Sequence, residues 1–232
     1  MGTASPTADA TPVSSRLTRA SAFSYVCNRC LRCCYAKHIQ TNPYEIARIA
    51  RHQGVSTTEC RERWTVDGLG TVLAQTATGA CVFLGADGCT IHPSRPLVCR
   101  MYPLGRHVSS DGSERFSHAE PHPQTAGEYG THGTIAEFLE NQEVADLAEA
   151  ADDYFRWFCR VLERVGDPSL GGELPEHASP DSPLRCLDLD LALGSYCAAH
   201  GIPEPAELPE RRALHLKILY ELLDSPTEGV TS

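Results

Sequence analysis

Four cysteines within eight residues constrain this chain more than any other feature of its sequence. They form the run Cys27-Asn-Arg-Cys30-Leu-Arg-Cys33-Cys34, which is a C-x2-C-x2-C-C pattern. A two-residue spacer lets a tight turn direct two thiolates at one metal while backbone N–H groups face the sulfurs, so each C-x2-C unit is a chelating half-site. The run therefore predicts a metal centre rather than a set of unrelated buried cysteines.

The run alone does not supply a complete ligand set. The bacterial ferredoxin run C-x2-C-x2-C-x3-C-P is close in pattern, but its fourth cysteine falls on Lys37 here and no proline follows. Three distant cysteines are candidates for the missing ligands, namely Cys81, Cys89 and Cys99. Glycines flank two of them, and prolines restrict the backbone before the third. Both features suit segments that must turn to place their sulfurs at a metal centre. Seven thiols exceed the needs of one tetrahedral ion, so a cluster or two metal centres is expected.

The cysteines of the run are expected to differ in their roles. Cys33 and Cys34 are adjacent, and neighbouring side chains of an extended stretch diverge, so these two thiols are not expected to bind one ion equivalently. Cys27, Cys30 and Cys33 are the expected ligands, with a fourth from the distant segment. The remaining cysteines are expected to be packing residues: Cys60, Cys159, Cys186 and Cys197.

The distribution of charge supports thiolates in the first half of the chain. From Ala22 to His107 there are ten Lys/Arg and five Asp/Glu, whereas Val108 and the residues after it include eight Lys/Arg and 24 Asp/Glu. Metal ligands must be thiolates, and nearby cations can offset their charge. The cations concerned are Arg29, Arg32, Lys37, Arg95, Arg100 and Arg106.

Composition also bounds the compartment and the partners. Residues 1–21 contain no apolar signal segment, and no apolar run is long enough to cross a bilayer, so we expect a cytoplasmic protein whose thiols stay reduced. The net charge of −10 argues against a nucleic acid or a membrane as partner, and no aromatic residues are interleaved with the arginines. The expected partner is an unidentified small molecule or protein, and the oligomeric state is left open.

Helix signals dominate the rest of the chain. Capping residues predict helices that begin after Asn42, Ser56 and Thr134. Apolar periodicity predicts two more, over Glu143–Val165 and Pro209–Leu223. The longer one is expected to bury a face made of Leu147, Ala151, Tyr154, Phe158, Val161 and Val165.

Some segments are short or ambiguous. Val72–Ala77 and Cys81–Leu84 are predicted to be short strands, and Leu184–His200 alternates like a strand although its length favours a helix. The expected fold class is α+β, mainly helical, with a small irregular domain that is nucleated by metal. The predicted parts are a disordered tail (1–21), a cysteine-cluster domain (22–140) and an acidic helical extension packed on it (141–232).

Several segments taken together resemble one known family. They are the Cys27–Cys34 run, Glu45-Ile46, Cys81-Val82-Phe83-Leu84, Gly88-Cys89-Thr90-Ile91-His92, and Arg95-Pro96 followed by Cys99-Arg100-Met101-Tyr102-Pro103. The combination is similar to the YkgJ-type cysteine-cluster family, a zinc- or iron-chelating domain, over about residues 22–140. The domain also occurs in flagellin lysine N-methylases, so the resemblance admits an iron–sulfur cluster, methyl transfer and S-adenosylmethionine.

The chain departs from that family in one segment. Such proteins often carry a further cysteine after the Cys-Arg-x-x-Pro motif, where this chain has Phe116–Gly127 with histidines and no cysteine. His122 is therefore an eighth candidate ligand, and an imidazole in place of a thiolate would raise the potential of a cluster, as in Rieske centres. The alternative is a solvated loop histidine. His38, His92 and His107 are weaker candidates.

Three functions follow from these residues. The first hypothesis is a protein with a 4Fe–4S cluster that serves an oxidoreductase or group-transfer reaction, including methyl transfer by resemblance. The alternatives are a non-catalytic zinc module whose acidic helices bind a partner, and a metal carrier with labile thiolates. Thiolates suit both zinc and iron–sulfur centres. The sequence contains no G-x-S-x-G elbow, P-loop, G-x-G-x-x-G or H-E-x-x-H motif, so catalytic residues stay unassigned.

Overall fold

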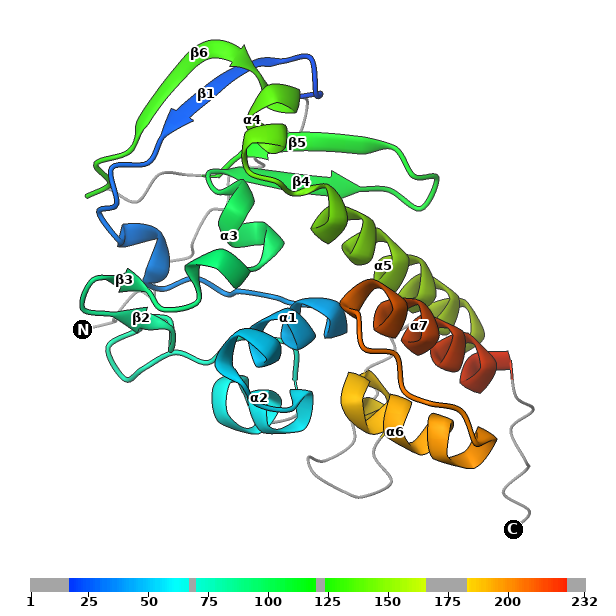
Figure 1. Cartoon of the computed structure of the whole chain (residues 1–232). Helices are drawn as coiled ribbons and strands as arrows, with labels where there is room; N and C mark the ends of the chain where they lie inside the picture. The colour runs from blue at the N-terminus through cyan, green and yellow to red at the C-terminus, as the bar shows by residue number, and fades with distance from the viewer. Residues whose placement is uncertain (1–16, 67–69, 120–123, 166–182, 225–232) are drawn as a thin grey trace, which may run out of the picture.

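Helices predominate in the structure, a computed structural model that describes residues 17–66, 70–119, 124–165 and 183–224 (Figure 1). With three small antiparallel pairs of strands beside them, the predicted α+β, mainly helical fold class is confirmed. The helices are α1 (Pro43–Gln53), α2 (Thr57–Trp64), α3 (Leu97–Met101), α4 (Ile135–Asn141), α5 (Ala145–Val165), α6 (Leu189–His200) and α7 (Leu208–Asp224). The strand pairs are β1 (Ala22–Val26) with β6 (Glu128–Thr134), β2 (Leu84–Gly85) with β3 (Gly88–Cys89), and β4 (Leu104–Val108) with β5 (Glu114–His118).

Side-chain caps fix where three of these helices begin. At α1 the Glu45 N–H donates to Asn42 Oδ1, and the Asn42 N–H donates back to the Glu45 carboxylate, both at 3.0 Å. Thr134 and Glu137 form the same reciprocal box at α4. Ser56 caps α2 through its hydroxyl, which accepts a backbone N–H of the first turn. The three predicted helix starts are therefore confirmed, because a cap is a local interaction that short sequence motifs specify.

The predicted strand over Val72–Ala77 is wrong. The residues of this segment form only isolated bridges, and each bridge involves a different part of the chain: Val72 with Gln40, Leu73 with Thr65, and Gln75 with Cys81. A strand needs one continuous neighbour, which this segment lacks among the described residues. Of the second predicted strand, Cys81–Leu84, only Leu84 lies in a strand, β2.

The ambiguous segment Leu184–His200 resolves into two helical pieces. A 3-10 helix spans Pro183–Leu187, and α6 follows from Leu189 to His200. Asp188 caps α6 through its carboxylate, which accepts the backbone N–H of Leu191. The favoured helix is thus confirmed from Leu189 onward. Of the alternating leucines, Leu187 ends the 3-10 helix, whereas Leu189, Leu191 and Leu193 lie within α6.

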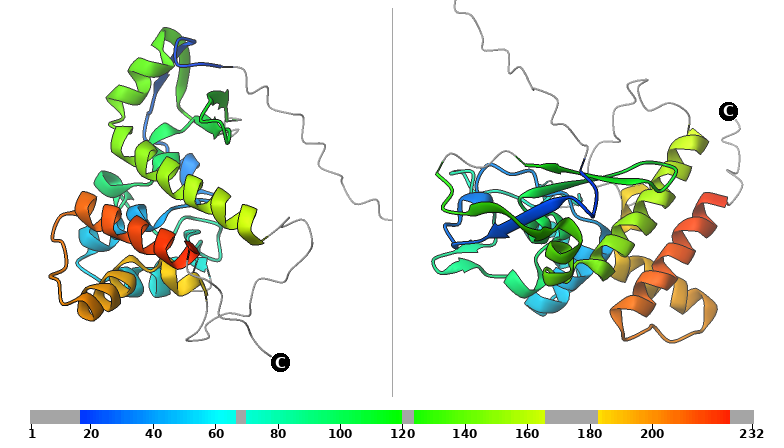
Figure 2. Two further views of the ribbon diagram at one scale, coloured as in Figure 1. Left: turned by 90° about the vertical axis from the view of Figure 1, so that its right-hand side faces the viewer. Right: turned by 90° about the horizontal axis from the view of Figure 1, so that it is seen from above.

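One apolar core connects the N-terminal strands to the C-terminal helices. Phe23 of β1, Phe116 of β5 and Ile135 of α4 share a cluster with Leu147 of α5 and Leu219 of α7, all at most 2% exposed. A second cluster lies under the cysteine segments, between α1, α2 and the hairpin β2–β3. Both views of Figure 2 show α5 and α7 side by side, and α1 packs against α6 and α7.

Among the side chains that the structure describes on α5, which do not include Val165, the buried face differs from the prediction at Phe158. Phe158 is 49% exposed, whereas Trp157 packs against the main core and donates its indole N–H to the carbonyl of Leu219 at 3.1 Å. Trp157 and Phe158 are three and four residues after Tyr154, so helix periodicity places both of them close to the buried face. The indole hydrogen bond explains why Trp157 faces α7 and Phe158 does not.

The N-terminal segment is described from Leu17 onward. Leu17 exchanges two backbone hydrogen bonds with Phe116, at 3.1 and 2.8 Å, and its side chain packs against the main core. Leu17 is therefore held against β5. Within the described residues, no helix combines the length and the apolar character that a membrane span needs.

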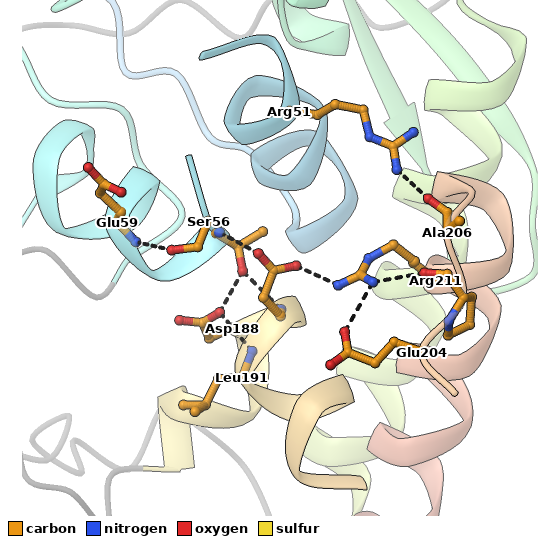
Figure 3. A network of polar contacts seen from close by, with 11 residues as sticks. Arg51, Ser56, Glu59, Asp188, Leu191, Glu204, Ala206 and Arg211 are labelled. Atoms are coloured by element: carbon orange, nitrogen blue, oxygen red, sulfur yellow. Dashed lines mark hydrogen bonds and ion pairs between the residues drawn. The ribbon is translucent and has the colours of Figure 1, made fainter. Parts of the chain in front are cut away.

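The N-termini of α2 and α6 cap each other (Figure 3). The Thr57 N–H donates to Asp190 Oδ2 at 2.7 Å, the Thr57 hydroxyl donates to Asp188 Oδ1 at 2.6 Å, and the Asp190 N–H donates to Thr57 Oγ1 at 2.9 Å. Arg61 Nη1 lies 3.8 Å from the Asp188 carboxylate, and Arg211 Nη2 lies 2.7 Å from that of Asp190. This network joins α2 to α6 and α7.

His215 is a fully buried histidine whose two ring nitrogens both have partners. Nδ1 lies 2.8 Å from the hydroxyl of Tyr154, and Nε2 lies 2.7 Å from the carbonyl oxygen of Cys186. A carbonyl can only accept, so Nε2 carries the proton, and Nδ1 accepts from Tyr154. Burial lowers the pKa of His215 to about 4.

We expect His215 to make folding sensitive to mild acid. Its contribution is complete above the ordinary histidine pKa of about 6.5 and is lost as the pH falls to about 4, at a cost of about 3 kcal/mol. Burial raises the pKa of Glu45 to about 7, which makes stability change in the opposite direction between about pH 7 and 4.5. The measurement is urea unfolding of the parent and of His215→Gln at about pH 6.5 and at about pH 4. The difference between the two proteins reports His215 alone, because Glu45 is present in both. An equal pH dependence in the two proteins would contradict the prediction.

Candidate metal centre

Three chain segments bring the cysteines together beside α1. The backbone N–H of Cys81 donates to the carbonyl of Cys34 at 2.8 Å, which joins the first segment to the second. The hairpin β2–β3 then pairs Cys89 with Leu84, and α3 contains Cys99. Figure 1 shows this hairpin and α3 next to the segment that follows β1. Gly88 has a φ of 121°, which glycine adopts without strain because it has no Cβ. It therefore allows the tight turn just before Cys89.

Cys33 and Cys34 converge rather than diverge. They lie in a 3-10 turn over Arg32–Cys34 that follows Leu31, whose φ is 62°, and their sulfurs are 4.0 Å apart. Two thiolates on one tetrahedral zinc lie about 3.8 Å apart, since each Zn–S bond is about 2.3 Å. The assumption of an extended stretch, in which the two thiols point apart, is therefore wrong. That the two thiols do not bind one ion equivalently stays a prediction. A hydrogen bond from Cys34 lowers the pKa of Cys33, and the same bond raises the pKa of Cys34.

Six thiols interact electrostatically with one another. Cys34 interacts with the thiols of Cys33, Cys81 and Cys89, and Cys30 interacts with Cys33. Burial raises the pKa of Cys99, and the charges of three neighbouring thiolates raise it further. The group brought together is Cys30, Cys33, Cys34, Cys81, Cys89 and Cys99.

Cys27 is the exposed cysteine of the run. It acts on the hydroxyl of Tyr25, as Cys33 does. In the part of the chain that the structure describes, no three or more His, Cys, Asp or Glu side chains already have the arrangement of a metal site.

Backbone amides face three of the gathered sulfurs in the same way. In each case the N–H two residues farther along the chain donates to the sulfur, which is the geometry expected of a chelating half-site. Such N–H donors stabilise the negative charge of a thiolate. The donors and acceptors are Arg32 to Cys30, Phe83 to Cys81 and Ile91 to Cys89.

Cations lie beside the thiols, although not all of those that the sequence suggested. Lys37 and Arg95 act on Cys33, and Arg95 acts on Cys89 as well. Arg106 lies elsewhere, because its guanidinium pairs with Glu114 and, at 2.6 Å, with Asp152 of α5. Lys37 and Arg95 thus act on the thiols as the sequence suggested, whereas Arg106 pairs with carboxylates instead.

Two of the candidate histidines have other partners. His107 lies 2.8 Å from the Ser117 hydroxyl, and His92 lies 2.8 Å from the Arg95 guanidinium. Burial lowers the pKa of His92, and neighbouring arginines lower it further. His118 contacts the ring of Phe23. His122, the eighth candidate ligand, lies outside the described residues, so it stays a prediction.

A turn that the sequence analysis did not single out lies at the sulfur of Cys30. Thr125 Oγ1 is 3.7 Å from Cys30 Sγ, and the Ala126 N–H donates to the same sulfur at 3.4 Å. One feature of the sequence could have pointed to this segment. Phe116–Gly127 lacks the further cysteine that proteins of the resembled family often carry there. The structure places its last residues beside the cysteine run.

The packing role predicted for the other cysteines is confirmed where they are buried. Cys60 is 0% exposed, with its sulfur 3.9 Å from the carbonyl of Ile46, and Cys197 is 3% exposed. Cys186 is half-buried against the main core, and burial raises its pKa. Cys159 is half-buried on α5.

Comparison with models of known protein families gives a match. A family model named CxxCxxCC, described as a putative zinc- or iron-chelating domain, matches residues 26–122. The matched span includes all seven clustered cysteines and ends at His122. No curated protein and no solved structure matches the chain.

Proposed function

Residues 26–122 belong to the CxxCxxCC family of zinc- or iron-chelating domains, the cysteine-cluster family that the sequence predicts, and from this premise we propose that the centre is an iron–sulfur cluster of the 4Fe–4S type. The observation that carries the proposal is the number of thiols that interact with one another. Six gather, whereas one tetrahedral ion takes four ligands. A centre with several metal atoms fits this donor set better than a single zinc.

The residues that would hold the cluster come from all three segments. Cys30 and Cys33 of the run are the first candidates, with Cys81 and Cys89 from the second segment, because backbone N–H groups face three of these sulfurs. Cys34, whose sulfur lies 4.0 Å from that of Cys33, and Cys99, whose pKa the neighbouring thiols raise, would complete the set. When bound, such a cluster supplies electron transfer or, at an open iron, a binding site for a substrate.

The protein's own groups prepare this site for a charged centre. A cluster ligated by thiolates is anionic, and Lys37 and Arg95 reduce the electrostatic cost of gathering negative sulfurs. The apolar cluster beneath the cysteines, which includes Phe83 and Ile91, shields one side of the site from water. These features suit a redox or group-transfer reaction, with methyl transfer admitted by the family resemblance alone.

The test is anaerobic purification of the full chain, followed by metal analysis, acid-labile sulfide analysis and an absorption spectrum. We expect iron and sulfide in nearly equal amounts and a broad visible absorption that bleaches on reduction. A colourless protein with zinc and no sulfide would contradict the proposal and identify a zinc module instead. Rapid loss of metal to a chelator at neutral pH, again without sulfide, would identify a carrier.

A further inference from the structure

We propose that the turn formed by Thr125 and Ala126 is a positioning device that makes Cys30 the most readily released ligand of the centre. The inference rests on the proposed function in one respect, since it requires that Cys30 binds a metal. It adds that the ligands differ in how readily they leave the metal, and that residues outside the cysteine segments cause this difference.

The sulfur of Cys30 receives more hydrogen bonds than any other thiol of the group in the described chain. The Ala126 N–H donates at 3.4 Å, the Thr125 hydroxyl lies at 3.7 Å, and the Arg32 N–H is a third donor. Cys81 and Cys89 each receive one backbone N–H, from the residue two positions ahead. The two additional donors at Cys30 both come from the turn.

The Thr125 hydroxyl is the donor in its contact with a metal-bound Cys30. The Gly127 N–H donates to Thr125 Oγ1 at 3.2 Å, so the oxygen already accepts one hydrogen bond. A metal-bound thiolate can only accept, so the Thr125 O–H is the group that donates to the sulfur.

The turn is held against the cysteine run from both sides. Asn28 Nδ2 donates to the Ala126 carbonyl at 2.7 Å and to Glu128 Oε1 at 2.9 Å. On the other side, a Cβ on Gly127 would lie 2.0 Å from Tyr25 Oη, so only glycine lets the tyrosine approach this closely. The contacts to Cys30 are therefore fixed by packing and do not depend on a loose loop.

The consequence for ligand exchange follows from the chemistry of thiolates. A hydrogen bond withdraws electron density from sulfur, so the metal–sulfur bond weakens, and it stabilises the thiolate that forms when that bond breaks. With three donors, Cys30 is the weakest donor to the metal and the best leaving ligand. Entry of a substrate, or transfer of the metal, would then begin at Cys30.

The experiment uses the full chain loaded with Co²⁺, whose thiolate charge-transfer band reports coordination whichever metal is native. In Thr125→Val one donor is lost, and we expect release of Co²⁺ to a chelator to slow about fivefold, as one neutral hydrogen bond predicts. The charge-transfer band should move to lower energy, because the sulfur becomes richer in electrons. Thr125→Ser keeps the hydroxyl and should restore both values, and the exposed Thr78→Val is the matched control.

The two proposals fail in different ways. Release from Thr125→Val at the parental rate or faster would overturn the positioning device, since a merely structural turn would loosen the centre when it is damaged. Failure of the parent to take up Co²⁺ through thiolates would overturn it too. Slower release from Thr125→Val in a protein that purifies with zinc would support the device while the iron–sulfur proposal fails.

Discussion

Replacing Cys89 by serine is expected to abolish metal loading and to unfold the cysteine segments in part. Cys89 lies in a two-residue strand next to Gly88, so the hairpin itself contributes little stability and depends on what its sulfur binds. Serine keeps the size but loses the thiolate that zinc and iron–sulfur centres require. Metal content should fall below about a tenth of the parental value, and the metal-linked stabilisation, about 4 kcal/mol at a thousandfold excess over Kd, should disappear.

The controls for this variant are cysteines of the other class. Cys159→Ala and Cys197→Ala should keep the parental metal content, and the second should cost only packing energy of about 1–2 kcal/mol, since Cys197 is 3% exposed. Metal analysis and urea unfolding, done side by side, separate the two effects. Full metal content in Cys89→Ser would remove Cys89 from the centre and take away the main support for a single network of thiols.

Replacing Asp188 by alanine is expected to destabilise the protein by about 3–5 kcal/mol. The Asp188 carboxylate is buried, caps α6, accepts from the Thr57 hydroxyl and lies 3.8 Å from Arg61, whose side chain is 3% exposed. Removing it leaves a buried guanidinium without this counter-charge and a helix without its cap, and both losses act on the same contact. Urea unfolding at pH 7 measures the change.

An exposed ion pair provides the matched control for Asp188. Asp224 lies 3.8 Å from Arg160, and both side chains are more than half exposed, so Asp224→Ala should change the free energy of unfolding by less than about 0.5 kcal/mol. If Asp188→Ala were equally mild, the reciprocal caps between α2 and α6 would contribute little to stability. The C-terminal helices would then be held by apolar packing and by their other polar contacts, such as that of Trp157 with Leu219.

Local motifs in the sequence predicted local structure well. Asn42 with Glu45, and Thr134 with Glu137, form boxes whose two partners are three residues apart, so the sequence contains the whole interaction. The C-x2-C-x2-C-C run likewise indicated a thiol-rich site, and the matched family agrees. In these cases no information from distant residues was needed.

The errors arose where distant residues decide the outcome. Leu31 takes a left-handed conformation that bends the cysteine run, and an extended stretch was the wrong assumption for Cys33 and Cys34. The contact of Thr125 with Cys30 joins residues 95 positions apart, and nothing in either segment alone specifies it. Trp157 was placed by a hydrogen bond to α7, which periodicity along α5 does not contain.

The pairing of β1 with β6 has a consequence for synthesis on the ribosome. Tyr25 pairs with Tyr129, and Val26 pairs with Glu128, so the strand that leads into the cysteine run lacks this partner until residues far along the chain have been made. Cys99, the last of the clustered thiols, emerges before any of β6. At the usual elongation rate, the 35 residues from Cys99 to Thr134 take about 2–7 s. During that interval every clustered thiol has been synthesised, and the turn that covers Cys30 is not yet in place.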